Sequence, residues 1–263
     1  MLVSGKNKTA LVTGASSGIG EELCELLAAD GHDLVVVARR RERLESLATR
    51  LSSDHGVKVS VIAKDLAAAG AAREVCASLD ARDISVDVLV NSAGFGDFAD
   101  VAGADQTRLG DMMQVNVVAL TELTRLLVPG MRERGSGRIL NIGSTAGFFP
   151  GPGMAVYYAS KAYVNSFTEA LATELAGSGV TATVLCPGPV ATEFQAEAHL
   201  EDSRFVKLAP MQTSEMVARA GYSAMNRGKV MEVPGLQYKL LPQLTRFSPR
   251  VVIRSVVRFL QTP

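Results

Sequence analysis

The chain has 263 residues, of which 47% are hydrophobic and 21% charged, enough apolar surface for one sizeable α/β domain. Its 27 basic and 27 acidic side chains cancel, so no overall field attracts nucleic acid, and we expect no nucleic-acid partner. Cys24, Cys76 and Cys186 are widely spaced in apolar settings, which predicts free thiols, no disulfide, no metal site and a reducing, cytoplasmic compartment. We expect no secretory signal, and the longest uncharged run, 139–160, contains prolines and glycines that argue against a membrane-spanning helix.

Short apolar runs alternate along the chain with segments of helical period. The runs that predict strands are Ala10–Val12, Leu34–Val37, Val57–Ile62, Val86–Val90, Arg138–Ile142 and Val180–Leu185. In the first interval, Ile19, Leu23, Leu26 and Leu27 fall at helical spacing, and Gly31 follows the last turn. Strands that are apolar throughout need both faces covered, so the alternation predicts a doubly wound parallel sheet between helices, with ligands at the carboxyl ends of the strands.

A glycine-rich turn follows the first predicted strand and leads into the first predicted helix. Its candidate nucleotide-binding residues are Gly14, Ser16, Ser17, Gly18, Ile19 and Gly20. Glycines let the backbone turn tightly and let a pyrophosphate approach the free N–H groups of the helix N-terminus. Such a motif alone could be an ordinary turn, but the strand before it and the helix after it favour a nucleotide site.

Basic residues stand where a nucleotide-binding domain that prefers NAD usually has an acidic one. The second strand is followed by Arg39, Arg40 and Arg41. An arginine fork suits a ribose 2′-phosphate, so we expect NADP(H) to be preferred over NAD(H), with Arg39 as the main contact and Arg40 beside it. A solvated basic start to the next helix remains the alternative for some of the three.

Two further segments follow predicted strands at the edge where a cofactor would lie. They contribute the candidate cofactor contacts Asp65, Leu66, Asn91, Ala93 and Gly94. An adenine edge or the cofactor backbone could be contacted there. Either segment alone could be a simple turn.

Candidate catalytic residues follow the fifth predicted strand. Gly143 and Ser144 follow that strand, and Tyr157 and Lys161 lie four residues apart, on one face of a helix if the segment is helical. A nearby ammonium favours the phenolate and would lower the pKa of Tyr157 toward the range useful for proton transfer. A chance pair on an exposed helix is the alternative. Tyr158 lacks the four-residue relation to Lys161, so we assign it to packing.

Five ordered motifs between Thr9 and Thr192 together resemble the short-chain dehydrogenases/reductases, in an NADP(H)-type branch. The glycine-rich turn is similar to that family's cofactor loop, Asp65 to its adenine contact, the segment 91–94 to its fourth-strand motif, and Asn116, Ser144, Tyr157 and Lys161 to its catalytic residues. The one departure is Ser92, where the family more often has Asn. The segment with Pro187, Gly188, Val190 and Thr192 resembles the one that contacts the nicotinamide amide.

This resemblance implies a Rossmann-type sheet of about seven strands in a single domain, 1–263, that works as a homodimer or homotetramer. It implies interconversion of a ketone and a secondary alcohol, with Ser144 bonded to the substrate oxygen and Tyr157 transferring the proton. Lys161 would bind the nicotinamide ribose, and Asn116 would hold a water that relays protons. A non-catalytic NADP(H) sensor or scaffold, and an epimerase or dehydratase on the same fold, stay open as alternatives.

The last part of the chain, 193–263, is predicted to form a substrate flap and a C-terminal helical part. Phe194, Phe205 and Leu208 suit a flap over a lipophilic substrate, although ordinary packing explains them equally. The segments 234–236 and 248–250 loosely resemble a branch that includes reductases of ketoacyl and steroid-like compounds.

A basic amphipathic helix is predicted near the C-terminus. Its arginines recur every four residues, at Arg246, Arg250, Arg254 and Arg258, beside apolar side chains. Such a helix could contact a membrane surface. We favour docking on the domain or on a second subunit.

Overall fold

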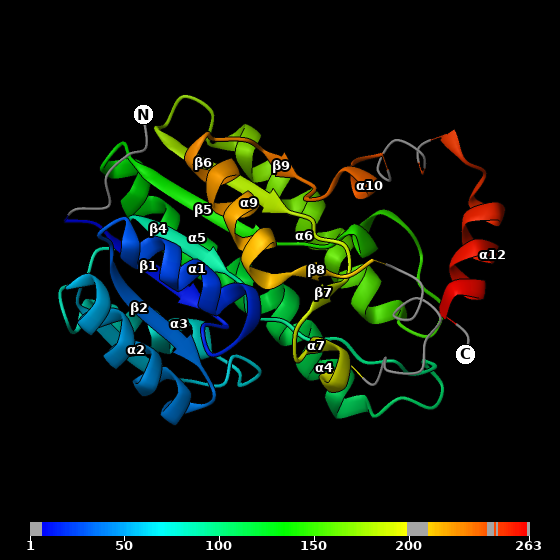
Figure 1. Ribbon diagram of the computed structural model, residues 1–263, viewed down its shortest axis with the longest axis horizontal. Helices are drawn as coiled ribbons and strands as arrows, with labels where there is room; N and C mark the ends of the chain where they lie inside the picture. The colour runs from blue at the N-terminus through cyan, green and yellow to red at the C-terminus, as the bar shows by residue number, and fades with distance from the viewer. Residues whose placement is uncertain (1–6, 199–209, 241–244, 246, 262–263) are drawn as a thin grey trace.

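The computed structural model describes residues 7–198, 210–240, 245 and 247–261, and its centre is one seven-stranded parallel sheet in the order β3-β2-β1-β4-β5-β6-β9 (Figure 1). Its strands are β1 (Thr9–Thr13), β2 (Asp33–Ala38), β3 (Val59–Ala63), β4 (Val88–Asn91), β5 (Gly137–Ile142), β6 (Val180–Leu185) and β9 (Met231–Glu232). A second, two-stranded parallel sheet pairs β7 (Val190–Ala191) with β8 (Gln212–Thr213). The predicted doubly wound fold is confirmed.

Helices cover both faces of the large sheet. One face carries α1 (Gly18–Ala29), α2 (Arg41–His55) and α9 (Ser214–Asn226), whose buried side chains form one core with the strands. The other carries α3 (Ala71–Asp80), α5 (Leu120–Glu133) and α6 (Ala155–Glu174), which share a second core. The remaining helices in the described part of the chain are α4 (Gln106–Met113), the π-helix η1 (Gln114–Ala119), the 3-10 helix η2 (Thr145–Phe148), α7 (Phe194–Glu197), α10 (Leu236–Lys239) and α12 (Arg250–Gln261).

Successive side chains of the central strands enter opposite cores. In β1, Ala10 and Val12 belong to the core under α1 and α2, whereas Leu11 belongs to the core under α3 and α5. In β2, Val36 and Val35 divide in the same way. Because side chains alternate along a strand, a strand covered on both faces must be apolar at every position, which is the pattern the sequence shows.

All six strands predicted from the sequence are present, with ends that differ by at most two residues. The seventh, β9, was not predicted individually. It contributes only two residues at the sheet edge, where Met231 pairs with Val184 and Glu232 with Leu185. So short a strand carries no periodicity, and its position depends on the neighbouring strand β6 rather than on its own sequence.

The direction in which the chain crosses the sheet reverses between β1 and β4. The chain moves outward from β1 through β2 to β3, then returns to place β4 on the other side of β1. The Thr13 hydroxyl at the end of β1 accepts hydrogen bonds from the backbone N–H groups of Ser92 and Ala93, both at 3.1 Å. This is the topological switch point, where open parallel sheets of this type bind ligands.

The C-terminal helix docks on the domain through part of its apolar surface. Ile253 and Val257 of α12 pack in a cluster with Tyr158 and Met154, whereas Val252 and other apolar side chains of the helix are exposed. Arg246, Phe205 and Leu208 lie outside the described residues. None of the helices in the described part of the chain has the length and hydropathy needed to cross a bilayer. Contact with a membrane surface stays a prediction.

Two buried threonines differ in whether their hydroxyls are satisfied. Thr183 of β6 is fully buried, and its hydroxyl has no hydrogen-bond partner among the described residues. Thr168 of α6 is equally buried, but its hydroxyl donates to the Val164 carbonyl at 2.7 Å and accepts from Asn141 Nδ2 at 2.9 Å. A buried hydroxyl without a hydrogen-bond partner makes the folded protein less stable than an apolar group of the same shape would at that position.

We therefore expect Thr183→Val to raise the free energy of unfolding by about 1 kcal/mol, because it removes an unsatisfied hydroxyl and keeps the volume. Thr168→Val is the matched control and should lower it by about 1 to 3 kcal/mol. Urea unfolding of both variants measures the two differences. Equal destabilisation by both would contradict the assignment of an unsatisfied hydroxyl at Thr183.

Candidate active site

A cavity of about 930 Å³ opens at the carboxyl edge of the sheet, bounded by the loops that follow the strands β1 to β6. Most of the residues predicted to bind or react line it. They are Gly14, Ser16, Ser17, Gly18, Ile19, Arg39, Arg40, Asp65, Leu66, Ala93, Gly94, Ser144, Tyr157, Lys161, Pro187, Gly188, Val190 and Thr192. Gly20, Asn91 and Asn116 stand behind this surface.

The glycine-rich turn forms a cradle that side chains would fill. Gly14 has a φ of +67°, and a Cβ there would lie 2.7 Å from the backbone nitrogen of Ala93. Gly18 has a φ of +59°, and a Cβ there would lie 3.1 Å from Cγ2 of Thr192. Ser17 precedes α1 without capping it through its side chain. The first N–H groups of α1 therefore remain available to an anion, which the helix dipole also favours.

Gly20 and Asn91 support the cradle from behind. A Cβ on Gly20 would lie 2.3 Å from the Gly14 carbonyl oxygen, so only glycine lets α1 start this close to the turn. Asn91 is buried, and its Nδ2 donates to Asn141 Oδ1 at 2.9 Å and to Thr124 Oγ1 at 3.2 Å. The Asn91 side chain thus ties β4 to β5 and α5.

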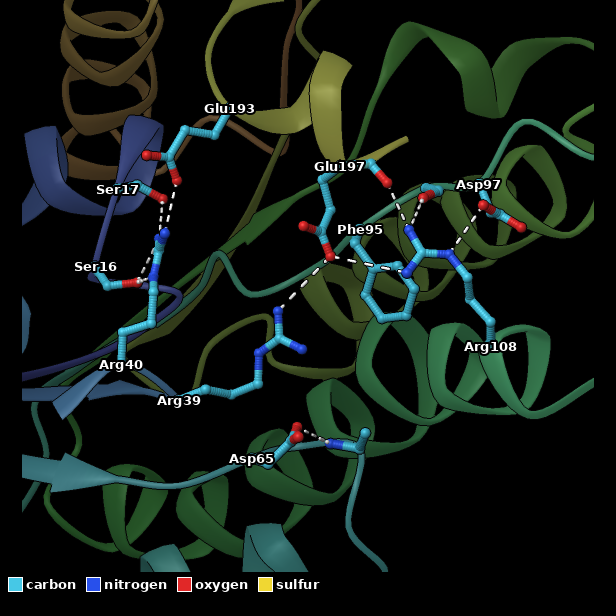
Figure 2. Close-up of polar contacts among 12 residues, drawn as sticks. Ser16, Ser17, Arg39, Arg40, Asp65, Phe95, Asp97, Arg108, Glu193 and Glu197 are labelled. Atoms are coloured by element: carbon cyan, nitrogen blue, oxygen red, sulfur yellow. Dashed lines mark hydrogen bonds and ion pairs between the residues drawn. The ribbon is translucent and has the colours of Figure 1, made fainter. Parts of the chain in front are cut away.

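The arginines after β2 lie at one end of the cavity, beside the glycine-rich turn (Figure 2). Arg40 donates to the Ser17 hydroxyl at 2.9 Å and to the Ser16 hydroxyl at 3.0 Å. Arg39 is more exposed and lies 3.8 Å from a carboxylate oxygen of Glu197. Arg41 pairs with Glu45 along α2 and does not line the cavity. The structure thus separates Arg41, as the solvated start of α2, from the other two.

Asp65 lies on the opposite side of the same end, in the loop after β3 (Figure 2). Its Oδ1 accepts a hydrogen bond from the Ala67 backbone N–H at 2.9 Å, which fixes the turn. The strand order places the loops after β3 and β2 side by side, so Asp65 borders the cavity together with Arg39, and its adenine contact stays a prediction.

Ser144, Tyr157 and Lys161 converge at the inner end of the cavity. Ser144 directly follows Gly143 at the end of β5, whereas the other two residues lie one turn apart on α6. The Ser144 hydroxyl accepts a hydrogen bond from the Ala146 N–H at 3.0 Å, and Lys161 Nζ lies 5.9 Å from the centre of the Tyr157 ring. Lys161 Nζ also donates to the Ile142 carbonyl at 2.8 Å.

Burial is the largest cause of the pKa shifts of Tyr157 and Lys161. Burial raises the pKa of Tyr157 to about 12, an effect that the hydrogen bond from Ser144 opposes. Burial lowers the pKa of Lys161 to about 8. Lys161 is not among the groups that shift the pKa of Tyr157 in the cofactor-free protein, where its Nζ lies 5.9 Å from the Tyr157 ring centre, so the predicted lowering by Lys161 is not found there. At neutral pH, Tyr157 therefore keeps its proton.

Asn116 occupies the π-helix η1, between α4 and α5. Its Nδ2 donates to the Phe95 carbonyl at 2.9 Å and to the Ser160 hydroxyl at 3.0 Å, and its Oδ1 accepts from the Phe95 N–H at 3.1 Å. A Cβ on Gly94 would lie 3.0 Å from Asn116 Oδ1 and 3.5 Å from Lys161 Nζ. Asn116 thus sits beside Lys161, with its side chain holding the loop after β4 in place. Single π-turns within helices are frequent at functional sites.

Sequence reasoning missed Asn165, which positions Ser144. It lies on α6 one turn beyond Lys161, and its Nδ2 donates to the Ser144 carbonyl at 3.1 Å. Its Oδ1 accepts from the Cys186 thiol at 3.3 Å. The spacing Tyr157, Lys161, Asn165 puts all three on one helix face, a signal that the sequence contained.

An apolar wall borders Tyr157. It is formed by Phe95, Phe149, Met154, Tyr158 and Phe194, all of which line the cavity. The Phe194 ring centre is 5.3 Å from that of Tyr157. Tyr158 is buried in the same cluster, as its assignment to packing predicted.

Arg108 is a charged side chain beside this wall that the sequence did not single out. Its Nε donates to Asp97 Oδ1 at 2.9 Å, its Nη2 donates to the Glu197 carbonyl at 2.5 Å, and its guanidinium stacks on Phe95 (Figure 2). These partners neutralise Arg108. The described residues contain no group of His, Cys, Asp and Glu side chains arranged to hold a metal ion.

Comparison with known proteins identifies the family. The family model described as short chain dehydrogenase matches residues 8–203. The chain belongs to the short chain dehydrogenases. A solved short-chain dehydrogenase from Sphingobium yanoikuyae, in complex with NADPH, is 31% identical, with a TM-score of 0.83 over 97% of this chain and 98% of that one.

Two curated relatives of this short chain dehydrogenase carry activity names. An NADP-dependent 3-hydroxy acid dehydrogenase of Salmonella typhi is 40% identical over 190 residues, 71% of this chain and 74% of that protein. A very-long-chain 3-oxoacyl-CoA reductase of Anas platyrhynchos is 35% identical over 191 residues, 70% of this chain and 60% of that protein. The chain thus spans about three fifths of the length of some curated relatives.

The residues at the carboxyl edge fit a nicotinamide dinucleotide. The glycine-rich turn leaves room for a ligand to lie against the backbone, the N-terminus of α1 has N–H groups free to bind an anion, and cationic side chains stand beside it. The length of the cavity connects this end to Ser144 and Tyr157. The arrangement can therefore place a phosphorylated dinucleotide with its reactive ring toward the catalytic group.

We expect the stability contribution of Lys161 to depend on pH in the cofactor-free protein. The pKa of Lys161 is lowered on folding from 10.5 to about 8. Between pH 8 and pH 10.5, Lys161 is protonated in the unfolded chain but not in the folded chain, so the free energy of unfolding rises with pH over this range. Below about pH 8, the destabilisation caused by burying Lys161 is fully present. From pH 7.5 to 9.5, the free energy of unfolding of the wild type should rise by about 2 kcal/mol relative to Lys161→Met.

Urea unfolding of both proteins at these two pH values measures the change, and Lys58→Met, which removes an exposed lysine, is the control. A gap between wild type and Lys161→Met that stays constant with pH would show that Lys161 is not desolvated as described.

Proposed function

We propose that this short chain dehydrogenase is an NADP(H)-dependent oxidoreductase that interconverts a lipophilic ketone and the corresponding secondary alcohol. The observation that carries the proposal is the convergence of Ser144, Tyr157 and Lys161 at the apolar end of a cavity whose other end carries Arg39 and Arg40. The family supports the oxidoreductase class. The NADP(H) dependence draws on the NADPH-bound structure and the NADP-dependent relative.

Each catalytic side chain has a role that its geometry suits. NADP(H), when bound, supplies or accepts the hydride at the substrate's carbonyl carbon. In the reducing direction the carbonyl oxygen takes the proton of the Tyr157 hydroxyl, and in the oxidising direction Tyr157 takes it back. The Ser144 hydroxyl orients the substrate oxygen, and Asn165 holds the Ser144 backbone. Lys161 provides the positive charge that steadies the phenolate once the proton has left.

The protonation state of Tyr157 suits ketone reduction. With its pKa raised to about 12, Tyr157 is a phenol at neutral pH and can donate a proton. The oxidising direction needs the phenolate and is favoured at higher pH. Asn116, beside Lys161, would hold the water that returns protons from solvent.

The substrate class follows from the apolar wall and from the relatives. Five aromatic or methionine side chains border the reactive end, and the nearby Arg108 is neutralised by its acidic neighbours. An anionic substrate group would therefore gain little binding energy from Arg108. The two named relatives act on 3-oxoacyl and 3-hydroxy acid compounds, so we propose ketones of ketoacyl-like or comparably bulky lipophilic type.

The role of the C-terminal part, the oligomeric state and the cellular compartment belong to the same proposal. Residues 193–263 would form the substrate flap and C-terminal part of one domain. A homodimer or homotetramer is supported by exposed apolar side chains on consecutive helices, namely Met113, Val118, Leu126 and Tyr163. A cytoplasmic setting is supported by Cys24, Cys76 and Cys186, which are free thiols.

We expect Tyr157→Phe to lower kcat for ketone reduction by at least about 10²-fold, with NADPH affinity retained, because it removes only the proton donor. NADPH oxidation with a panel of 3-oxoacyl thioesters and bulky ketones measures the loss. The matched control is Tyr163→Phe on the same helix, whose exposed hydroxyl bonds Thr121. Turnover by Tyr157→Phe near the wild-type rate would move the acid-base role elsewhere. NADPH binding by the wild type without turnover of any ketone would favour a sensor.

We expect Arg39→Asp to weaken NADPH binding at least tenfold and to leave NADH binding within about twofold, because a carboxylate repels the 2′-phosphate. Arg40→Asp should act in the same direction. Arg41→Asp makes the same charge change outside the cavity and is the control. Titration with both nucleotides measures the ratio of affinities, and a ratio that is the same in Arg39→Asp as in the wild type would contradict the assignment.

A further inference from the structure

Two carboxylates from the segment after β7 reach the arginine end of the cavity (Figure 2). Glu193 bridges Arg40 and Arg43, with its Oε2 accepting from Arg40 at 2.8 Å and its Oε1 from Arg43 at 2.7 Å. Glu197 lies 3.8 Å from Arg39. Arg39, Arg40 and Arg43, which we call the arginine corner, are therefore each paired with an acidic side chain at least 150 residues away in sequence.

Arg40 has little hydrogen-bonding capacity left for a ligand in this arrangement. It makes four hydrogen bonds, two to Ser16, one to Ser17 and one to Glu193. A guanidinium has five N–H donors in a fixed fork. A phosphate that takes up a two-pronged bond to Arg40 must therefore displace one of these partners.

The partner that a phosphate must displace is Glu193. The hydroxyls of Ser16 and Ser17 are neutral and can donate to a phosphate as well as accept from Arg40. A carboxylate has no proton to donate at neutral pH, and its charge repels a phosphate dianion. The two arginines hold the pKa of the Glu193 carboxyl below its usual value, so it stays ionised.

We propose that Glu193 is a specificity-determining residue for the cofactor, whose carboxylate occupies Arg40 and Arg43 in place of the ribose 2′-phosphate and weakens binding of NADP(H) by competing with it. The inference rests on the proposed NADP(H) dependence. An anion held near the phosphate lowers affinity for the phosphorylated nucleotide alone. Such weakening suits an enzyme that must release the oxidised nucleotide in each turnover.

The side chain of Glu193 can be changed without dismantling its segment. The turn is held by neighbours, since the Phe194 N–H bonds the Thr192 hydroxyl at 3.3 Å and the Thr192 N–H bonds Gln195 Oε1 at 3.3 Å. Glu193→Gln keeps the size and an acceptor oxygen but removes the charge. Glu215→Gln is the matched control, because it breaks an exposed glutamate–arginine pair with Arg219 outside the cavity.

The probes are 2′,5′-ADP, which carries the 2′-phosphate, and 5′-ADP, which does not. Calorimetric titration of the wild type should show tighter binding of 2′,5′-ADP. Glu193→Gln should tighten 2′,5′-ADP binding a further three- to tenfold and change 5′-ADP binding by less than twofold, whereas Glu215→Gln changes neither. Because the competing charge is exposed, the gain should shrink between 20 mM and 500 mM salt.

The outcomes separate this inference from the proposed function. If neither the wild type nor Glu193→Gln prefers 2′,5′-ADP, the NADP(H) assignment fails, and the role of Glu193 fails with it. If the preference is present but Glu193→Gln leaves it unchanged or reduces it, only the competition is overturned, and a reduced preference would show that Glu193 instead orients the arginines for the phosphate. A gain in affinity that does not depend on salt would also overturn it, because a structural change rather than charge would then be responsible.

Discussion

The contact between the end of β1 and the loop after β4 is the constraint on which the rest of the site depends. Thr13 accepts hydrogen bonds from two consecutive N–H groups of that loop, and Gly14 lies so close to Ala93 that no side chain would fit. Because the chain leaves these two strands on opposite faces of the sheet, a crevice opens directly above the contact. The glycine-rich turn and Gly94 both take their positions from it.

The two ends of the cavity work in different electrostatic environments. At the inner end, Lys161 and Ser144 are buried, so desolvation governs the pKa values, and each polar group needs a specific partner such as the Ile142 carbonyl or Asn165. At the outer end, Arg39, Arg40 and Glu193 are largely exposed, so charge pairs there are weak, exchangeable and screened by salt. Chemistry is thus placed where water is excluded, and charge recognition where ligands must enter and leave.

Much of the site could be predicted because its signals are local. A glycine-rich turn between a strand and a helix, arginines at a strand end, and Tyr157 four residues before Lys161 each express a backbone geometry within a few residues of sequence. Nearly continuous apolar strands likewise implied two covered faces. The parts that could not be predicted are contacts between segments far apart in the sequence, such as Glu193 with Arg40, Asn116 with Phe95 and Arg108 with the Glu197 carbonyl.

By itself, the sequence determined the strand and helix order, the doubly wound sheet and the residues that reach its carboxyl edge, because periodicity and turn chemistry are properties of neighbouring residues. The tertiary structure alone decided that burial keeps Tyr157 protonated and weakens the charge of Lys161, that Arg41 faces away from the cavity, and that Glu193 pairs with the arginine corner. These depend on desolvation and on distances between segments far apart in the chain, which arise only when the sheet brings those segments together.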